Sequence, residues 1–227
     1  MQHKDWDQLN TICDVSRETF ERLSIYLRLL KEWQSHINLV SQSTLDDGWR
    51  RHIVDSAFVY TLQPRFHRWL DLGSGAGFPG MVVAILKAGD AYTQQSNDQL
   101  PAVTMIESVG KKCAFMNAVL RETGLRGAPV QVKIVNRRIE AALPPELPVD
   151  VVSARALASL TNLMDLTETA FETDAIGIFL KGARYGDEIK QARSRWQFEC
   201  DALDHPASPG SKVLIVRNAK KTDRLER

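Results

Sequence analysis

Apolar side chains in residues 16–37 recur at intervals of three and four, which is the spacing of one face of an amphipathic helix. Ser16 is a suitable N-cap for this helix. We expect a second helix over residues 49–60. Neither segment has the alternation of a strand. We therefore expect residues 1–62 to form a helical cap on a second unit, residues 63–227.

From Trp69 onward the pattern changes to short apolar runs that alternate with helical stretches. The predicted strands cover residues 69–72, 103–107, 130–135, 150–153, 175–180, 198–202 and 213–217. The predicted helices cover residues 81–87, 110–123, 138–142, 160–171 and 187–196. Alternating strands and helices form parallel strands with right-handed crossovers. The sequence thus predicts an α/β fold, an open sheet with helices on both faces.

The composition is that of a globular protein, since 44% of the 227 residues are hydrophobic and 25% are charged. No run approaches the roughly 20 apolar residues of a membrane helix, and the polar N-terminus does not resemble a secretory signal. Three scattered cysteines predict reduced thiols rather than a disulfide framework or a zinc site. We therefore expect a cytoplasmic protein with no membrane or metal partner.

The net charge of +1 argues against a protein that grips many phosphates along a duplex, because such proteins carry a basic excess. Any contact with RNA must therefore come from local clusters of basic residues. The candidate clusters are Arg50 and Arg51, Lys111 and Lys112, Arg137 and Arg138, Lys181 with Arg184, and Lys220 with Lys221.

The first predicted strand runs into a glycine-rich loop, Asp71-Leu72-Gly73-Ser74-Gly75-Ala76-Gly77-Phe78-Pro79-Gly80. Glycine allows the chain to turn sharply and lets a ligand approach the backbone without a Cβ in the way. In open α/β sheets, ligands bind outside the carboxyl ends of the strands. The loop therefore predicts a cofactor site.

Two features of this loop bear on which cofactor it binds, because Gly75, Gly77 and Gly80 also satisfy the dinucleotide fingerprint. The carboxylate of Asp71 suits the cationic amino group of a methionine moiety, whereas it would repel a pyrophosphate. Pro79 has no N–H to donate where a dinucleotide phosphate would need one. The loop thus favours S-adenosylmethionine over a dinucleotide.

Glu107 ends the second predicted strand, at the edge of the sheet where the glycine loop lies. An acid at this position can accept hydrogen bonds from both hydroxyls of a ribose. Sites for nicotinamide dinucleotides and sites for S-adenosylmethionine share this arrangement. Glu107 therefore predicts a nucleoside cofactor without choosing between the two.

Several segments, in order along the chain, together resemble one family, the small-subunit rRNA guanine-N7 methyltransferases called RsmG or GidB. The matching stretches are residues 37–41 (INLVS), 51–56 (RHIVDS), 69–80 (WLDLGSGAGFPG), 107–112 (ESVGKK), 138–140 (RIE), 152–156 (VSARA) and 179–182 (FLKG). The GFPG end of the glycine loop and the SARA segment are the most specific of these. The resemblance covers residues 33–196, while the polar loop of residues 88–102 departs from the family pattern.

The resemblance implies a Rossmann-like methyltransferase fold, a seven-stranded and mostly parallel sheet with an antiparallel last strand and an N-terminal helical cap. It also implies that S-adenosylmethionine contacts Gly73, Phe78, Ile139, Glu140 and Arg155. The implied partner is 16S rRNA or the small ribosomal subunit. We expect the enzyme to act as a monomer.

The residues after the fourth strand bear on the methyl acceptor. Methylation of an exocyclic adenine amine usually accompanies an Asp/Asn-Pro-Pro-aromatic element there, whereas this chain has Ser153-Ala-Arg155-Ala. Methylation of pyrimidine carbon-5 needs a thiolate nucleophile, and neither Cys113 nor Cys200 is suitably placed. Both alternatives are therefore disfavoured.

Guanine N7 has a free lone pair and no proton, so its methylation needs positioning rather than a general base. No residue is therefore assigned as a catalytic base. Arg155 and Lys181 both lie at carboxyl ends of predicted strands. We expect them to orient the cofactor carboxylate, an RNA phosphate or the O6 edge of the guanine.

His52 and Asp55 lie three residues apart on the second helix, but no further ligand with metal-site spacing accompanies them. We interpret this pair as a helix-surface or cap-packing pair rather than as a metal site. The tryptophans at positions 33, 49 and 69 are likewise interpreted as packing between the cap and the sheet. Phe78 is the aromatic residue that we expect beside the ligands.

Three alternatives to rRNA methylation remain open at this point. An oxidoreductase of the NAD type would use the same loop, but it needs a catalytic acid or base near its substrate, and none is apparent. A binding module would retain the fold without turnover, which the intact Asp71, Glu107 and Arg155 argue against. A methyltransferase acting on a small molecule or a protein would use the cap to cover its pocket.

Overall fold

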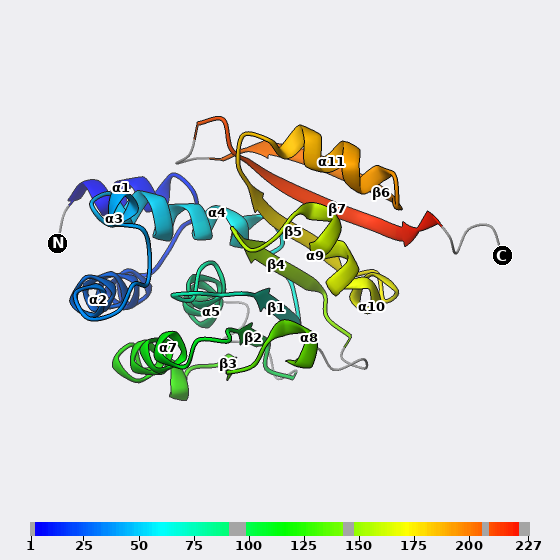
Figure 1. The fold of residues 1–227 in the computed structure, drawn as a ribbon. Coiled ribbons are helices and arrows are strands. Elements are labelled where there is room, and N and C mark those ends of the chain that lie inside the picture. Colours follow the sequence, from blue (N-terminus) through cyan, green and yellow to red (C-terminus); the bar gives the residue numbers. More distant parts are fainter. Residues whose placement is uncertain (1–2, 91–98, 143–147, 206–208, 223–227) are drawn as a thin grey trace.

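The computed structural model describes residues 3–90, 99–142, 148–205 and 209–222. A layer of helices precedes the first strand, as predicted (Figure 1). It comprises α1 (His3–Asn10), α2 (Arg17–Gln34), α3 (Gln42–Leu45), a π-helical turn (Trp49–Val54) and α4 (Asp55–Leu62). The backbone N–H of Thr19 donates to Ser16 Oγ over 3.1 Å, which confirms the N-cap of α2. The short helices α1 and α3 were not predicted.

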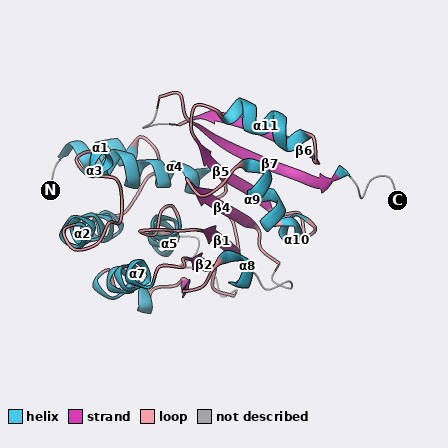
Figure 2. Cartoon of the chain, viewed as in Figure 1, coloured by secondary structure: helices cyan, strands magenta, loops and turns pink. Residues whose placement is uncertain are grey.

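The seven strands form one sheet, shown as magenta arrows in Figure 2. They are β1 (Arg68–Leu72), β2 (Ala102–Ile106), β3 (Gln131–Val135), β4 (Val151–Arg155), β5 (Ile176–Lys181), β6 (Trp196–Asp204) and β7 (Lys212–Lys221). Their order across the sheet is β3-β2-β1-β4-β5-β7-β6, and β7 runs antiparallel to both of its neighbours. The seven-stranded, mostly parallel sheet with its antiparallel last strand is confirmed.

Helices cover both faces of the sheet, as predicted (Figure 1). The remaining helices are α5 (Gly80–Gly89), α7 (Gly110–Glu122), α8 (Ile139–Ala142), α9 (Leu160–Leu166), α10 (Glu168–Phe171) and α11 (Tyr185–Arg193). One hydrophobic core joins α5 and α7 to the cap helices, and a second core lies under α9, α10 and α11. The cap is therefore packed into the core on one face of the sheet.

Two predicted boundaries are wrong. The predicted helix 160–171 breaks at Thr167, whose Oγ1 donates to the carbonyl oxygen of Leu163 over 2.7 Å. Such a side-chain bond to the preceding turn competes with the helical pattern. Trp196 does not end a helix but begins β6, where it pairs with Lys221 and its indole N–H donates to Asp165 over 3.1 Å.

The polar loop predicted between the first two α/β units begins after α5, and residues 91–98 of it lie outside the described residues. In the part of the chain that is described, no helix is long and apolar enough to cross a membrane. The parallel strands β1, β2, β4 and β5 all end at one edge of the sheet, where the predicted site residues follow them.

Candidate cofactor site at the carboxyl edge of the sheet

The glycine loop joins β1 to α5 and has a backbone that suits only glycine at several positions. Gly73, Gly75 and Gly77 adopt φ values of 60°, 57° and 98°. A Cβ on Gly77 would lie 2.9 Å from the hydroxyl of Tyr26, whereas one on Gly75 would meet only the Gly73 carbonyl oxygen, at 3.9 Å. The loop is thus packed against the cap at Gly77 and open at Gly75.

Asp71 lies at the base of this loop and is completely buried. Ser153 Oγ donates to its Oδ1 over 2.7 Å, and the backbone N–H of Gly80 donates to its Oδ2 over 3.2 Å. Burial raises the pKa of Asp71 to about 6, although its hydrogen bonds from Ser153, Ser74 and Gly80 lower it. The carboxyl group therefore ties β1 to β4 and to the start of α5. Its predicted contact with the methionine moiety stays a prediction.

Glu107 follows β2 and reaches the open part of the glycine loop. Its Oε2 accepts a hydrogen bond from the backbone N–H of Gly75 over 2.9 Å, and its Oε1 accepts one from Val109 over 2.7 Å. The side-chain amide of Asn136, just after β3, donates to the Glu107 carbonyl oxygen over 3.0 Å. The structure thus brings together the ends of β1, β2 and β3 around this acid.

Phe78 is buried in a stack of three rings rather than projecting from the loop. Its centroid lies 4.9 Å from that of Tyr26 and 4.7 Å from that of His52, with interplanar angles of 19° and 18°. The hydroxyl of Tyr26 donates to the carbonyl oxygen of Ala76 over 2.5 Å. The cap therefore supports the glycine loop through aromatic stacking and one buried hydrogen bond.

Arg155 ends β4 and bridges the sheet to the cap. One of its Nη atoms lies 2.6 Å from His52 Nδ1, and the other donates to the carbonyl oxygen of Arg51 over 3.2 Å. Its guanidinium carbon lies 5.5 Å from the centroid of Phe78. Burial lowers the pKa of Arg155, which the negative charge of Asp55 partly offsets. Arg155 is thus a half-buried donor group beside the glycine loop.

The remaining predicted site residues lie after β3 and at the end of β5. Ile139 and Glu140 open α8, directly after β3, where Ile139 is half-buried and Glu140 is exposed. Lys181 ends β5, is buried, and forms an ion pair with Glu188 Oε2 over 2.8 Å. Lys181 also donates to the carbonyl oxygen of Ala158. Since the chain already uses this ammonium group, its role toward a ligand stays a hypothesis.

His52 and Asp55 are both buried, at 0% and 2% exposure, so the pair lies inside the molecule rather than on a helix surface. Asp55 Oδ1 lies 3.1 Å from Nδ1 of His205, which follows β6. Among the described residues, no group of three or more His, Cys, Asp or Glu side chains could hold a metal ion.

All three tryptophans pack against other rings, but only Trp33 does so across the boundary of the cap, and it contacts helix α7 rather than the sheet. Trp33 makes an edge contact with Phe115, Trp49 packs against Phe20, and Trp69 packs against Phe66. Sequence reasoning had no signal for the supporting roles of other side chains. The apolar spacing in residues 16–37 predicts that Tyr26 is buried but not that it supports the glycine loop.

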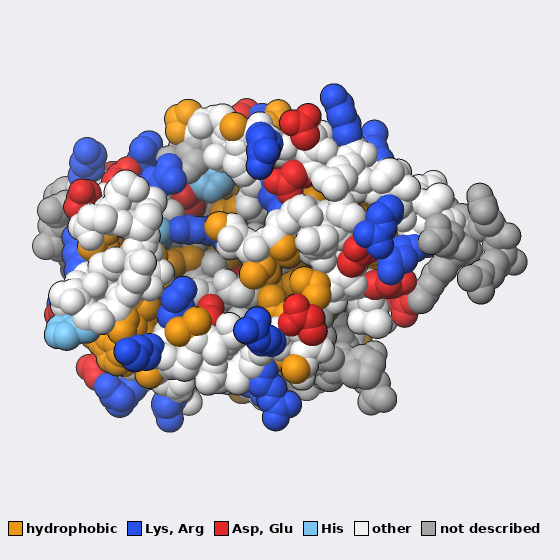
Figure 3. Space-filling view, in the orientation of Figure 1, with side chains coloured by type: hydrophobic (Ala, Val, Ile, Leu, Met, Phe, Trp, Pro, Cys, Tyr) orange, Lys and Arg blue, Asp and Glu red, His pale blue; other side chains and the backbone are white. Residues whose placement is uncertain are grey.

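Several of the candidate RNA-binding residues are exposed near the carboxyl edge of the sheet. They are Lys111 at the start of α7, Arg137 and Arg138 after β3, and Arg184 after β5. In the face shown in Figure 3, Lys and Arg side chains surround a hollow between the cap and the sheet. Lys220 and Lys221 end the antiparallel strand β7 and so lie at the opposite edge. They do not belong to the same cluster.

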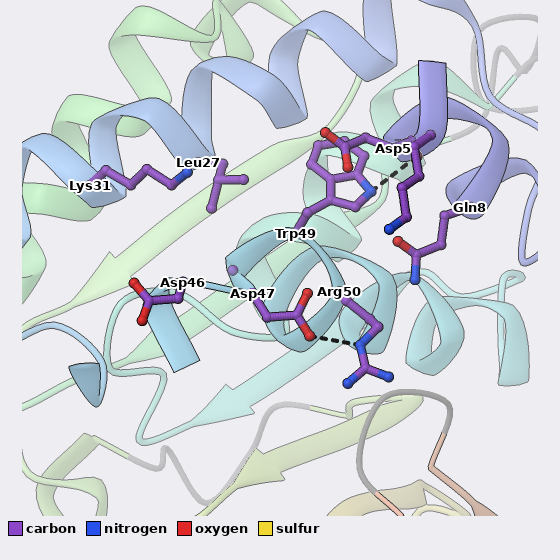
Figure 4. A pocket seen from close by; sticks show the side chains of 10 residues that line it. Asp5, Gln8, Leu27, Lys31, Asp46, Asp47, Trp49 and Arg50 are labelled. Atoms are coloured by element: carbon purple, nitrogen blue, oxygen red, sulfur yellow. Dashed lines mark hydrogen bonds and ion pairs between the residues drawn. The ribbon is translucent and has the colours of Figure 1, made fainter. Parts of the chain in front are cut away.

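Arg50 borders a separate cavity of about 610 Å³ in the cap (Figure 4). Its Nε lies 2.7 Å from Asp47 Oδ2, and the indole N–H of Trp49 donates to the carbonyl oxygen of Asp5 over 3.0 Å. Three acidic and three basic side chains line this cavity, so their charges balance. The cavity contains none of the predicted cofactor residues.

Two solved structures with a similar fold are methyltransferases. The O-methyltransferase TomG of Streptomyces achromogenes, solved with S-adenosylmethionine, superposes with a TM-score of 0.55 over 96% of this chain and 99% of its own, at 14% identity. A methyltransferase of Geobacter sulfurreducens gives a TM-score of 0.57 over 91% of this chain and 98% of its own, at 13% identity. The fold is therefore that of the S-adenosylmethionine-dependent methyltransferases.

The particular family follows from sequence. The family model for rRNA small subunit methyltransferase G (GidB) matches residues 19–211, and this chain belongs to that family. A ribosomal RNA small subunit methyltransferase G from a Ruegeria species is 42% identical over 93% of this chain and 97% of its own length. The protein of that name from Parvibaculum lavamentivorans is 42% identical over 96% of this chain and 92% of its own. Family membership decides against the oxidoreductase alternative.

Proposed function

We propose that this enzyme transfers a methyl group from S-adenosylmethionine to N7 of one guanine in 16S rRNA. One observation carries the proposal: the family match spans residues 19–211, and within it the open glycine loop, Glu107 and Arg155 meet at one edge of the sheet. The rRNA substrate comes from the names of the relatives, and the choice of N7 comes from the resemblance noted in the sequence, with which the chemistry of the site is consistent.

The residues present fit S-adenosylmethionine. The loop is open at Gly75, the carboxylate of Glu107 lies against that opening, and Arg155 is a cationic donor close by. These groups suit the ribose hydroxyls and the carboxylate of such a cofactor. When bound, S-adenosylmethionine supplies a methyl group on a cationic sulfur, and the chain has to orient the acceptor and exclude water.

The protonation states of His52 and Arg155 suit an acceptor without a proton. Burial lowers the pKa of His52 to about 3, so its imidazole is neutral and weakly basic. Arg155 keeps its proton and can only donate. Neither side chain is a good base for an amine acceptor, whereas guanine N7 needs none. Arg155 and Lys181 are the donors that we propose to orient the cofactor or the guanine.

The charge distribution supports recognition of a local RNA structure. The chain has a net charge of only +1, and the candidate basic residues that are exposed near the site are Lys111, Arg137, Arg138 and Arg184. Such a surface suits an accessible, unpaired guanine rather than a long duplex, because single-stranded bases expose their edges. We also propose that the enzyme acts in the cytoplasm as a monomer. Light scattering on the purified protein tests its oligomeric state.

The decisive experiment measures methyl transfer from radiolabelled S-adenosylmethionine to small ribosomal subunits that lack the modification. Borohydride–aniline cleavage then locates any N7-methylguanine. We expect label at one guanine, with a loss of at least about tenfold in rate for Glu107→Gln, which weakens the hydrogen bonds at the loop. Glu122→Gln, at an exposed acid in α7, is the matched control and should retain full activity.

Other outcomes would identify other functions. Cofactor binding without transfer to any ribosomal RNA would contradict the rRNA proposal and favour a small-molecule acceptor. If the rRNA is labelled but borohydride–aniline does not cleave it at the labelled nucleotide, only the assignment of N7 as the methyl acceptor is contradicted. Lys181→Met with unchanged kcat and KM would remove Lys181 from the proposed site.

A further inference from the structure

A partly buried hydrogen bond between His52 and Arg155 joins the cap to the end of β4. The two residues are 103 positions apart in the chain, and their nitrogen atoms lie 2.6 Å apart. The carbonyl oxygen of Arg51, the residue before His52, accepts from the same guanidinium over 3.2 Å. Two neighbouring cap residues thus hold both ends of one guanidinium group. In the proposed function, that group faces the cofactor.

The direction of this hydrogen bond follows from the chemistry of the two groups. Arginine has donors only, so His52 Nδ1 has to accept, and the imidazole has to be neutral with its proton on Nε2. Complete burial of His52 and the nearby positive charges of Arg155 and Arg51 all favour the neutral ring. The buried Nε2 has no hydrogen-bond partner among the described residues. Among the described residues, the imidazole of His52 therefore forms its hydrogen bond through Nδ1.

We propose that His52 is a positioning residue of the cofactor site, whose Nδ1 fixes the Arg155 guanidinium beside the glycine loop. This inference rests on the proposed function, in which Arg155 contacts S-adenosylmethionine. His52 itself also stacks on Phe78, with centroids 4.7 Å apart. A purely structural role would need that stacking but not the acceptor at Nδ1, so the two roles can be separated by substitution.

Two substitutions of His52 separate these roles. His52→Phe keeps an aromatic ring for the stack on Phe78 but has no acceptor. His52→Asn loses the ring, whereas its amide oxygen can occupy the place of Nδ1. The probe is S-adenosylhomocysteine, measured by calorimetry, together with KM and kcat for S-adenosylmethionine. We expect His52→Phe to weaken binding about tenfold or more and to raise KM, and His52→Asn to stay within about threefold of the wild type.

A double-mutant cycle tests whether His52 acts through Arg155. If it does, adding His52→Phe to Arg155→Met should cause little further loss of affinity, because the group that His52 holds is already absent. His36→Phe, at an exposed histidine beyond α2, is the matched control and should bind like the wild type. Circular dichroism of each variant checks that the fold is retained.

Each failure has a distinct meaning. Wild-type affinity in His52→Phe would overturn the role of His52 while leaving the proposed function in place. Equal losses of cofactor affinity in His52→Phe and His52→Asn would also overturn it and indicate packing alone. The same conclusion would follow if the loss from His52→Phe added in full to the loss from Arg155→Met. Absence of cofactor binding by the wild type would overturn the proposed function itself.

Discussion

The junction between the cap and the glycine loop differs sharply from the antiparallel edge formed by β6 and β7. At the junction, Tyr26, His52 and Arg155 form hydrogen bonds that span 50 to 104 residues of sequence and are largely shielded from water. At the edge, the ion pair of Arg217 with Asp201 spans 16 residues of a hairpin, and both side chains are exposed. Both regions are rich in polar contacts, but only one of them supports the proposed site.

The difference shows why counting polar contacts is a poor guide to their importance. A buried hydrogen bond is strong because the surrounding dielectric is low, and a buried partner left unpaired is costly. An exposed ion pair is weakened by water and salt. We therefore expect substitutions at the junction to change both stability and cofactor binding. Substitutions at the edge should change neither by much.

The largest expected effect is at Tyr26, which is completely buried between Phe78 and Phe115. Tyr26→Ala removes a large side chain from a packed core, which typically costs about 3–5 kcal/mol. The glycine loop also loses its support, so cofactor affinity should fall. Chemical denaturation measures the first effect, and calorimetry with S-adenosylhomocysteine measures the second.

Tyr26→Phe provides the finer control, because it removes only the hydroxyl that donates to Ala76. Its expected cost is about 1 kcal/mol, the usual value for one hydrogen bond, plus the desolvation of the carbonyl oxygen left without this donor. If Tyr26→Ala lost less stability than Tyr26→Phe, the cap would not support the loop as described.

The second effect concerns Asp71 and depends on pH. Burial raises its pKa from 3.8 to about 6 in the folded state, so the neutral carboxyl group stabilises the fold. This contribution is complete below the unfolded pKa and is lost as the pH rises through about 6. Asp71→Asn mimics the neutral form and cannot titrate. The free energy of unfolding of the wild type, relative to Asp71→Asn, should fall by about 2 kcal/mol between about pH 4.5 and pH 7.5.

Equilibrium unfolding of the two proteins across that pH range measures the difference directly. Other titrating groups contribute equally to both proteins and cancel. A difference that is independent of pH would mean that Asp71 is ionised throughout the range. A difference that rises with pH would mean that its hydrogen bonds outweigh its burial.

The parts of the molecule that the sequence predicts are those specified by local pattern. The glycine loop, the acid after β2 and the alternation of strands and helices need only neighbouring residues for their recognition. The placement of Glu107 at the glycine loop then follows from the rule that parallel strands end at one edge. Family resemblance supplied the antiparallel last strand, which no local pattern specifies.

The contacts that the cap makes with the glycine loop and with Arg155 could not be predicted from local pattern. The apolar face of α2 predicts that Tyr26 is buried, but not that its hydroxyl meets the carbonyl oxygen of Ala76. Likewise, the spacing of His52 and Asp55 says nothing of Arg155, because the partners come together only when the cap packs against the sheet. The break at Thr167 could not be predicted either. The apolar periodicity of the predicted helix continues past this residue, whereas its side chain bonds to the carbonyl oxygen of Leu163 and competes with the helical pattern.

The smallest expected effect is at Arg217, whose Nη1 lies 2.7 Å from Asp201 Oδ2 with side-chain exposures of 37% and 62%. Arg217→Ala should lower the free energy of unfolding by no more than about 0.5 kcal/mol, because water screens the pair and holding two flexible side chains together costs entropy. Cofactor affinity should not change. Denaturation at low and at high salt measures the contribution of the pair. A loss comparable to that of Tyr26→Phe would contradict the comparison, since a contact within an exposed hairpin would then matter as much as a buried one between distant segments.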